Sequence, residues 1–215
     1  MRQRTHRVAG ILLAAGASTR MGVPKQLLPI QGRPMLSLLL EQALASSLDK
    51  VVLVLGHCAP EIRTALGHEL RHPRLLVMDN PDYADGISSS IKAGLRCIRD
   101  ETDHVVILLG DMPFLTADLI DRFLHEYLES GRPLGAVAVG GRRSHPVAFS
   151  RELYDELEEI SGDTGARDLF RKYAARACLV EAEARYDDRD MDTFADYERV
   201  AGNCPQAESR GKIER

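Results

Sequence analysis

The residues Ile-Leu-Leu-Ala-Ala-Gly-Ala-Ser-Thr-Arg-Met-Gly-Val-Pro-Lys occupy positions 11–25 and decide how the rest of the chain is interpreted. Their apolar beginning belongs to a run from Val8 to Ala14, which predicts a buried strand. Gly16 and Gly22 follow, and glycine lets the backbone come close to an anion so that N–H groups of the loop can point at it. The stretch therefore predicts a strand that leads into a phosphate-binding loop.

The cations are typical of a phosphate site, and the glycine spacing excludes two common types of phosphate-binding loop. Arg20 and Lys25 would neutralise a bound phosphate. A Walker loop has the spacing Gly-x4-Gly-Lys-Ser/Thr, whereas here five residues separate the two glycines and Lys25 lies three positions beyond the second. The dinucleotide fingerprint Gly-x-Gly-x-x-Gly is also absent. The plainer alternative is a strand that ends at a glycine turn with solvated cations.

Length and composition limit the class of protein. A chain of 215 residues is long enough for one sizeable core, so we expect a single domain over residues 1–202 and a polar, disordered tail over 203–215. Hydrophobic residues make up 44% and charged residues 28%, as in ordinary globular proteins. A net charge of −4 argues against a nucleic-acid partner, because binding to the phosphate backbone relies on clustered Lys and Arg.

Other features of the sequence indicate where in the cell the protein lies. No apolar run approaches the roughly 20 residues that span a bilayer, and the basic start lacks a signal-peptide cleavage site, so we expect no membrane partner. The four cysteines form no Cys-x-x-Cys pair, which indicates neither a zinc ribbon nor a redox motif. We therefore expect a cytoplasmic protein with reduced thiols.

Apolar runs alternate with segments of helical spacing over the first 130 residues, which predicts strands and helices in alternation. The predicted strands after the first are 51–56, 75–78 and 105–109, and the predicted helices are 35–46, 59–66, 86–98 and 116–129. Residues 135–140 and 145–149 flank a Gly-Arg-Arg-Ser turn, which is typical of a hairpin. The sequence thus predicts a Rossmann-like, three-layer α/β fold with a mainly parallel sheet and a mixed C-terminal part.

Carboxylates at two distant places suit a metal site. Asp111 directly follows the strand predicted over 105–109, and ligands bind at the carboxyl ends of parallel strands. Magnesium takes one or two carboxylates together with phosphate oxygens and water. We predict Asp111 as one Mg²⁺ ligand and Asp192, with Asp190 as its close rival, as the other. The alternative for the second pair is a solvated acidic run before a helix.

The loop resembles the signature of the nucleotidyltransferases that activate sugar phosphates and the molybdenum cofactor, above all the molybdenum cofactor cytidylyltransferase and guanylyltransferase group. The matching residues are Leu13, Ala14, Ala15, Gly16, Ser18, Arg20, Met21, Gly22 and Lys25. The resemblance implies a fold of the nucleotide-diphospho-sugar transferase type, with Arg20, Lys25 and Asp111 as catalytic residues. It also implies a second acidic element before the last helix, often Asp-x-Asp-Thr-Pro, in which Phe194 replaces the proline here.

Other segments resemble the two substrate sites of that group. Nucleotide contacts are implied for Leu13, Ala14, Ala15, Gly16, Ser18, Gly22, Lys25, Asn80, Gly86 and Ser89. Acceptor contacts are implied for His145, Pro146, Asp163 and Arg167, although Ser144 stands where glycine is usual. A histidine before Pro-Val is more often structural without that context. Arg142, Arg143 and Arg167 could bind the acceptor phosphate, with Arg167 ranked first, although an arginine-rich turn is commonly just solvated.

The resemblance also implies a reaction. In this group Leu-Ala-Gly-Gly goes with guanine and Thr-Ala-Ala-Gly with cytosine, so Ala15 favours CTP over GTP whereas Leu13 departs from the cytosine pattern. We expect Mg²⁺-dependent transfer of CMP from CTP to molybdenum-molybdopterin with release of pyrophosphate, and a molybdenum hydroxylase as the receiving enzyme. Two alternatives are a sugar or polyol phosphate as acceptor, and a non-catalytic accessory protein that hands the cofactor to a hydroxylase.

Overall fold

The computed structural model describes residues 6–18, 21–183, 186–191 and 193–203. The predicted site residues Arg20 and Asp192 lie outside the described residues, as does the predicted tail from residue 204 onward. Among the described helices, none is long and apolar enough to cross a membrane.

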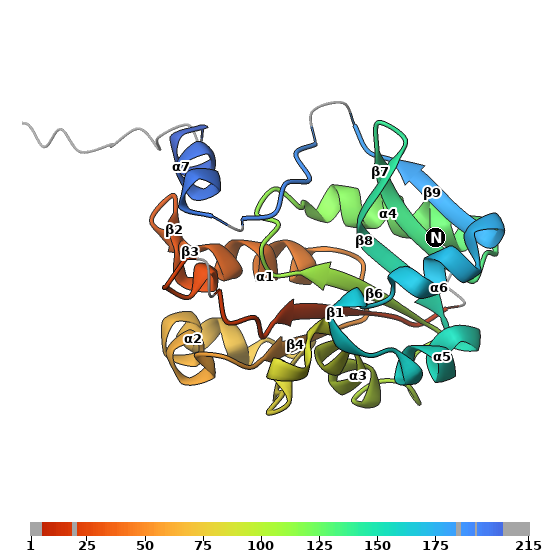
Figure 1. Ribbon diagram of the computed structural model, residues 1–215, viewed down its shortest axis with the longest axis horizontal. Coiled ribbons are helices and arrows are strands. Elements are labelled where there is room, and N and C mark those ends of the chain that lie inside the picture. The colour runs from red at the N-terminus through yellow and green to blue at the C-terminus, as the bar shows by residue number, and fades with distance from the viewer. Residues whose placement is uncertain (1–5, 19–20, 184–185, 192, 204–215) are drawn as a thin grey trace, which may run out of the picture.

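A seven-stranded sheet forms the centre of the molecule, with the strand order β5-β4-β1-β6-β8-β7-β9 (Figure 1). Its strands are β1 (Val8–Ala14), β4 (Lys50–Leu55), β5 (Leu75–Asp79), β6 (His104–Leu109), β7 (Leu134–Val139), β8 (Arg142–Ser150) and β9 (Ala177–Glu181). Only β8 runs against its neighbours within this sheet, pairing antiparallel with β6 and β7. The predicted α/β fold with a mainly parallel sheet and a mixed C-terminal part is therefore confirmed.

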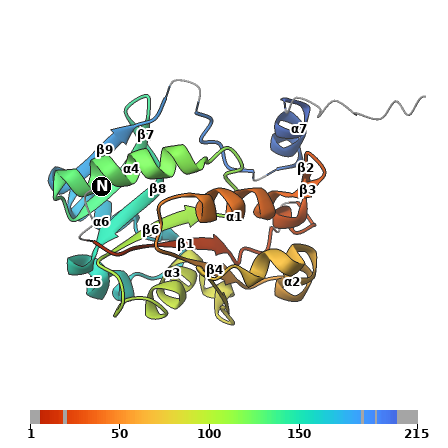
Figure 2. The same ribbon diagram turned by 180° about the vertical axis from the view of Figure 1, so that it is seen from behind.

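Helices cover both faces of the sheet. They are α1 (Met35–Ala45), α2 (Ala59–Leu66), α3 (Ile87–Arg96), α4 (Ala117–Ser130), α5 (Tyr154–Glu159) and α6 (Arg167–Lys172), followed by α7 (Phe194–Asn203) near the edge of the molecule. Figure 1 shows α3, α5 and α6 in front of the sheet, and Figure 2 shows α1 and α4 on the opposite face. The result is the predicted three-layer arrangement.

The central strand β1 explains why two cores form. Every residue of β1 is buried. Leu12 and Ala14 join the core beneath α1 and α4, whereas Ile11 and Leu13 join the core beneath α3, α5 and α6. Successive side chains of a strand point to opposite faces, so a continuous apolar run is what a strand covered on both sides requires.

A small third cluster ties the C-terminal part back to the first half. The two-residue strands β2 (Pro29–Ile30) and β3 (Arg33–Pro34) pair antiparallel, and Ile30 packs with Met35 and Met191. The Tyr197 hydroxyl of α7 donates a hydrogen bond to the Pro29 carbonyl oxygen at 2.9 Å. Met191 and α7 therefore pack against the segment that follows the glycine loop.

Truncation of the central strand should cost far more stability than truncation of the edge strand. Leu12 is fully buried in β1, whereas Leu179 in β9 is 53% exposed. We expect Leu12→Ala to lower the free energy of unfolding by about 2–5 kcal/mol, because it removes buried methyl groups and leaves a cavity. Leu179→Ala, the matched control, should change it by less than about 0.5 kcal/mol. Urea unfolding monitored by circular dichroism measures both, and equal losses would contradict the layered core.

Candidate functional site

The glycine loop and Asp111 meet because their strands are neighbours. β1 and β6 pair in parallel with Leu13 opposite Leu109, so the segments that follow them emerge at the same edge. The Gly110 amide donates to the Leu13 carbonyl oxygen at 2.8 Å, and a Cβ at Gly110 would lie 2.6 Å from that oxygen. Only glycine allows Asp111 to come this close to the end of β1.

An ion pair joins the two segments. The Lys25 Nζ atom lies 2.6 Å from Asp111 Oδ2, and the two side chains are only 14% and 18% exposed. The loop is shaped to hold this lysine, because the Lys25 amide donates to the Ser18 hydroxyl oxygen at 3.1 Å. Ser18 has a positive φ of 51°, and its carbonyl oxygen accepts from the Gly22 amide at 3.3 Å. The predicted residues Ser18 and Gly22 thus shape the loop around Lys25.

Gln26 also belongs to the loop, and sequence reasoning missed it. Its side chain is 3% exposed, and Nε2 donates to the carbonyl oxygens of Ala14 at 3.2 Å and Gly16 at 3.1 Å. These bonds bridge the end of β1 and the start of the loop. Its Oε1 atom has no hydrogen-bond partner among the residues that the structure describes. The available signal was a lone amide side chain between Lys25 and two leucines.

A cavity of about 590 Å³ opens above the loop. It is lined by the predicted nucleotide residues Leu13, Ala15, Gly16, Lys25 and Gly86, by Asp111 and Asp163, and by Ala17, Gln26, Tyr83, Ala84, Ile87, Ser90, Leu109 and Gly110. A lysine, several glycines and two carboxylates around one cavity suit a phosphate-bearing ligand with a metal ion. Five of the ten residues predicted to contact nucleotide therefore line one cavity, and their contact with nucleotide stays a prediction.

Asn80 and Ser89, predicted to contact nucleotide, support the wall of the cavity from outside its lining. The Asn80 amide donates to the hydroxyl oxygens of Ser89 and Ser90, at 2.9 and 3.0 Å. Its Oδ1 atom accepts from the Asp82 amide at 3.0 Å. The neighbouring Ser90 lines the cavity in place of Ser89. A direct contact of Asn80 or Ser89 with nucleotide stays a prediction.

A second cavity, of about 240 Å³, adjoins the first and shares Ile87, Leu109 and Asp163 with it. Its polar lining consists of Arg142, Arg143, Ser144, His145, Asp163, Thr164, Arg167, Asp188 and Asp190, and its apolar lining includes Ile91, Ile107, Val147 and Phe170. The predicted acceptor residues His145, Asp163 and Arg167 therefore meet in one place. Pro146 is buried behind them, joined to His145 by a cis peptide bond.

His145 is held neutral in this second cavity. Burial lowers its pKa to about 4, and the positive charges of Arg143 and Arg167 act in the same direction, against the opposing effects of an Ile107 backbone hydrogen bond and the Asp111 carboxylate. The Nδ1 atom has no hydrogen-bond partner in the described part of the chain. Near neutral pH the ring therefore offers this nitrogen as a hydrogen-bond acceptor.

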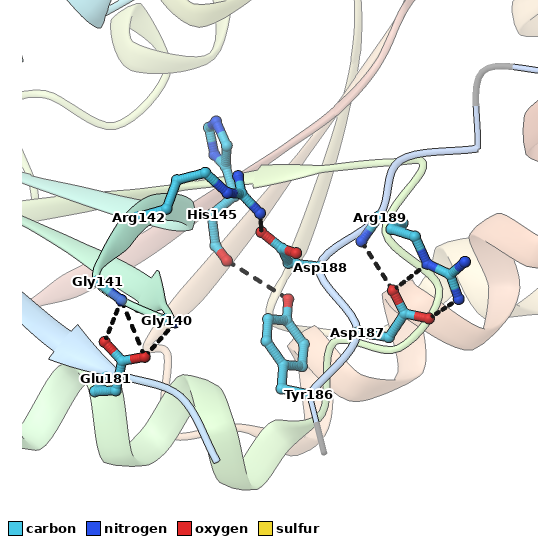
Figure 3. Close-up of polar contacts among 9 residues, drawn as sticks. All are labelled: Gly140, Gly141, Arg142, His145, Glu181, Tyr186, Asp187, Asp188 and Arg189. Carbon is cyan, nitrogen blue, oxygen red and sulfur yellow. Dashed lines mark hydrogen bonds and ion pairs between the residues drawn. The ribbon is translucent and has the colours of Figure 1, made fainter. Parts of the chain in front are cut away.

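The segment 186–191 crosses the second cavity. The Tyr186 hydroxyl donates to the His145 carbonyl oxygen at 3.5 Å, and Asp188 Oδ2 lies 2.7 Å from a guanidinium nitrogen of Arg142 (Figure 3). The Met191 amide donates to the Asp111 carbonyl oxygen at 3.2 Å. These contacts bring the stretch that contains Asp190 to Asp111. A metal site shared by Asp111 with Asp192 or Asp190 stays a prediction, because Asp192 lies outside the described residues and Asp190 lines the second cavity. The contacts of Tyr186 and Asp188 were not anticipated from the sequence.

The carboxylates present suit a divalent cation. Asp111 Oδ1 is buried and has no hydrogen-bond partner among the described residues, although carboxylate oxygens away from water are normally paired. Asp190, which lines the adjoining cavity, is the second candidate. Within the described ranges no three His, Cys, Asp or Glu side chains form a metal-binding group. A cation held by two carboxylates would take its other ligands from phosphate and water, as Mg²⁺ commonly does.

Comparison with known protein families shows to which family the chain is related. The model of the MobA-like NTP transferase domain matches residues 10–177. The chain belongs to the MobA-like NTP transferase family. The matched range contains the Lys25–Asp111 pair and the predicted acceptor residues, and it ends before segment 186–191.

Members of the MobA-like NTP transferase family similar to this chain carry different functional names. Nicotine blue oxidoreductase of Paenarthrobacter nicotinovorans is 30% identical over 207 residues, covering 90% of this chain and 96% of that protein. Purine catabolism protein PucB of Bacillus subtilis is 31% identical over 202 residues, covering 92% and 97%. Molybdenum cofactor cytidylyltransferase of Escherichia coli is 31% identical over 143 residues, covering 66% and 69%.

Solved structures agree with the fold. Rv0371c of Mycobacterium tuberculosis superposes with a TM-score of 0.80 at 26% identity, covering 93% of this chain and all of that one. A manganese complex of Rv0371c has a TM-score of 0.75 at 25% identity and covers 92% of this chain and all of that one. A fold of the nucleotide-diphospho-sugar transferase type, which the resemblance implied, is confirmed, and one of these structures is a complex with manganese.

The buried state of His145 should appear in the pH dependence of stability. Between pH 6.5 and about 4 an unfolded histidine binds a proton that folded His145 does not, so stability falls as the pH is lowered through this window. We expect His145→Gln to make the fall shallower, by up to about 1.4 kcal/mol per pH unit. Burial also lowers the pKa of His104 to about 4. His104 is present in both the unaltered protein and His145→Gln, so its contribution to the slope is the same in the two. Urea unfolding at pH 4 to 7 measures the slope, and an unchanged slope would contradict this state of His145.

Proposed function

We propose that this protein transfers a nucleotidyl group from a nucleoside triphosphate to the phosphate of an acceptor, with CTP as donor and molybdenum-molybdopterin as acceptor. The observation that carries the proposal is the Lys25–Asp111 pair, which lies in a cavity that adjoins a second cavity lined by arginines. Two adjoining cavities suit two substrates, and the charged pair suits a reaction in which negative charge moves between phosphate oxygens. A molybdenum hydroxylase would receive the product.

Positioning and charge stabilisation account for the chemistry. With the triphosphate on the glycine loop, the Lys25 ammonium would neutralise charge on the transferred and leaving phosphates, and Arg20 would assist. An acceptor phosphate oxygen attacks the α-phosphorus in line, the bond from the α-phosphorus to the bridging oxygen breaks, and pyrophosphate leaves. The attacking phosphate is already ionised near neutral pH, so no general base is needed.

A divalent cation would lie at Asp111, and we propose Mg²⁺. Asp111 and one of Asp190 and Asp192 would hold it, and the cation would supply further neutralisation of the phosphate charge. The unpaired Asp111 Oδ1 atom supports this assignment. Lys25 would remain beside the other oxygen, Oδ2, and so keep the carboxylate oriented.

The second cavity has the chemistry of an acceptor site. Arg143 and Arg167 supply positive charge for a phosphate, and the Arg143 guanidinium lies 4.5 Å from the centre of the Phe170 ring. Neutral His145 would accept a hydrogen bond from an N–H or O–H group of the acceptor. A flat heterocycle that carries a phosphate, such as molybdopterin, would use both the apolar and the cationic parts of this lining.

The choice of base would depend on Leu13 and Ala15, which line the first cavity. CTP is proposed because Ala15 matches the cytosine pattern and because the Escherichia coli cytidylyltransferase is 31% identical. The name of the Paenarthrobacter relative shows that other reactions occur in the family, so the acceptor and donor have to be tested directly.

Removal of the Asp111 charge should abolish the reaction without unfolding the protein. We expect Asp111→Asn to reduce turnover by about 100-fold or more, because its neutral side chain cannot stabilise a cation on the phosphates. Asp118→Asn, an exposed position in the first turn of α4, serves as the matched control and should retain activity. Pyrophosphate release measures turnover and circular dichroism checks folding. Near-full activity of Asp111→Asn would contradict the assignment of Asp111 as a catalytic residue that binds a cation.

A single set of assays should identify both the nucleotide donor and the acceptor. With Mg²⁺ and molybdenum-loaded molybdopterin, we expect CTP to give at least about tenfold faster pyrophosphate release than GTP, a difference of about 1.4 kcal/mol between the transition states. Pyrophosphate release with a sugar or polyol phosphate, and not with molybdopterin, would identify the alternative acceptor. Nucleotide or pterin binding without pyrophosphate release from any pair would favour the accessory protein.

A further inference from the structure

The wall between the two cavities is a contact between two distant segments, residues 86–88 and 162–165. Asp163 Oδ1 accepts a hydrogen bond from the Ile87 amide, the first residue of α3, at 3.2 Å. The Ser88 hydroxyl, which is almost fully buried, donates to the Gly162 carbonyl oxygen at 2.7 Å. Two polar contacts therefore fasten the acceptor-side loop to the start of α3.

The two segments, residues 86–88 and 162–165, pack so closely that neither has room to move alone. Gly86 has a φ of 95°, and a Cβ there would lie 2.6 Å from both Asp163 Oδ1 and the Gly162 carbonyl carbon. On the other side, a Cβ at Gly165 would lie 3.1 Å from Ile87 Cγ2. Since the backbones touch directly, a shift of one segment requires a shift of the other.

Each segment also contributes to a different site. Gly86 and Ser90, at the start of α3, line the nucleotide cavity, whereas Arg167, two residues beyond Gly165, lines the acceptor cavity. Asp163 lines both. Its carboxylate caps an α3 amide, an arrangement that the positive end of a helix favours, and its negative charge makes it a poor ligand for phosphate.

We infer that Asp163 is a positioning residue that couples the two sites, so that nucleotide bound against Gly86 fixes the loop 161–167 and with it Arg167. The inference rests on the proposed function, because it requires nucleotide and acceptor to occupy these two cavities. Coupling of this kind is reciprocal, and typical values change the affinity of the second ligand by about 5- to 150-fold. Asp163 thus acts on the acceptor through Arg167, which differs from the direct acceptor contact that the sequence implied.

Hydrogen–deuterium exchange of the full chain, with and without saturating CTP and Mg²⁺, tests the coupling. We expect nucleotide to slow exchange in the glycine loop and also in residues 161–167. Asp163→Ala should keep the first effect and weaken the second, because the bond to Ile87 is gone while the Ser88–Gly162 bond remains. Asp163→Asn should restore protection of 161–167, because its amide oxygen can still accept that bond.

Kinetics provide the second readout. We expect Asp163→Ala to raise the KM for the acceptor by about fivefold or more, while the Kd for CTP in the absence of acceptor changes by less than about twofold. Asp168→Ala is the matched control, since Asp168 is an exposed aspartate close to Asp163 in sequence and pairs only locally with Arg171 among the contacts described. This variant should behave like the unaltered protein.

The outcomes separate this inference from the proposed function. Protection of the glycine loop without protection of 161–167 in the unaltered protein overturns the coupling and leaves nucleotide binding intact. Failure of Asp163→Asn to restore protection also overturns it, because the hydrogen bond would then not be the link. Protection in both segments without pyrophosphate release from any acceptor supports the coupling and overturns the transfer reaction. No protection in either segment overturns both.

Discussion

The ion pair between Lys25 and Asp111 is the interaction on which the site depends. It joins residues 86 positions apart, at 2.6 Å, with both side chains mostly removed from water. Each of these partly desolvated charges is stabilised by the other, so the pair holds the end of the glycine loop against the segment that follows β6. The same charges are what a triphosphate and a divalent cation would need, so the pair lies where the proposed reaction requires charge stabilisation.

The parallel pairing of β1 with β6 places this ion pair at the carboxyl edge, and the antiparallel β8 places His145 beside it. One sheet therefore presents two cavities with different chemistry, one built on glycines and Lys25, the other on arginines and an apolar floor. Relatives named as a transferase and as an oxidoreductase share this family, so the scaffold by itself does not dictate the reaction.

Most of the fold and part of the site could be predicted from local patterns. The run from Val8 to Ala14 is β1, and the alternation of apolar runs with helical spacing gave the parallel sheet, because periodicity reports directly which faces are buried. Asp111 could be placed at the carboxyl edge of the sheet because it follows a strand, whereas a metal site that it shares with Asp192 or Asp190 stays a prediction. The roles of Gln26 and Asp163 could not be predicted, since each depends on which backbone group lies opposite after folding.

The sequence by itself determined the α/β class, the strand-to-glycine-loop unit and the kinds of side chain available for phosphate and metal, because these follow from spacing and residue chemistry. Only the tertiary structure decided that Ser18 supports Lys25, that Tyr186 and Asp188 cross the second cavity, and that Asp163 fastens the acceptor loop to α3. Such contacts join residues far apart in the chain. Their geometry is set by the packing of the whole sheet and its helices, which no local pattern encodes.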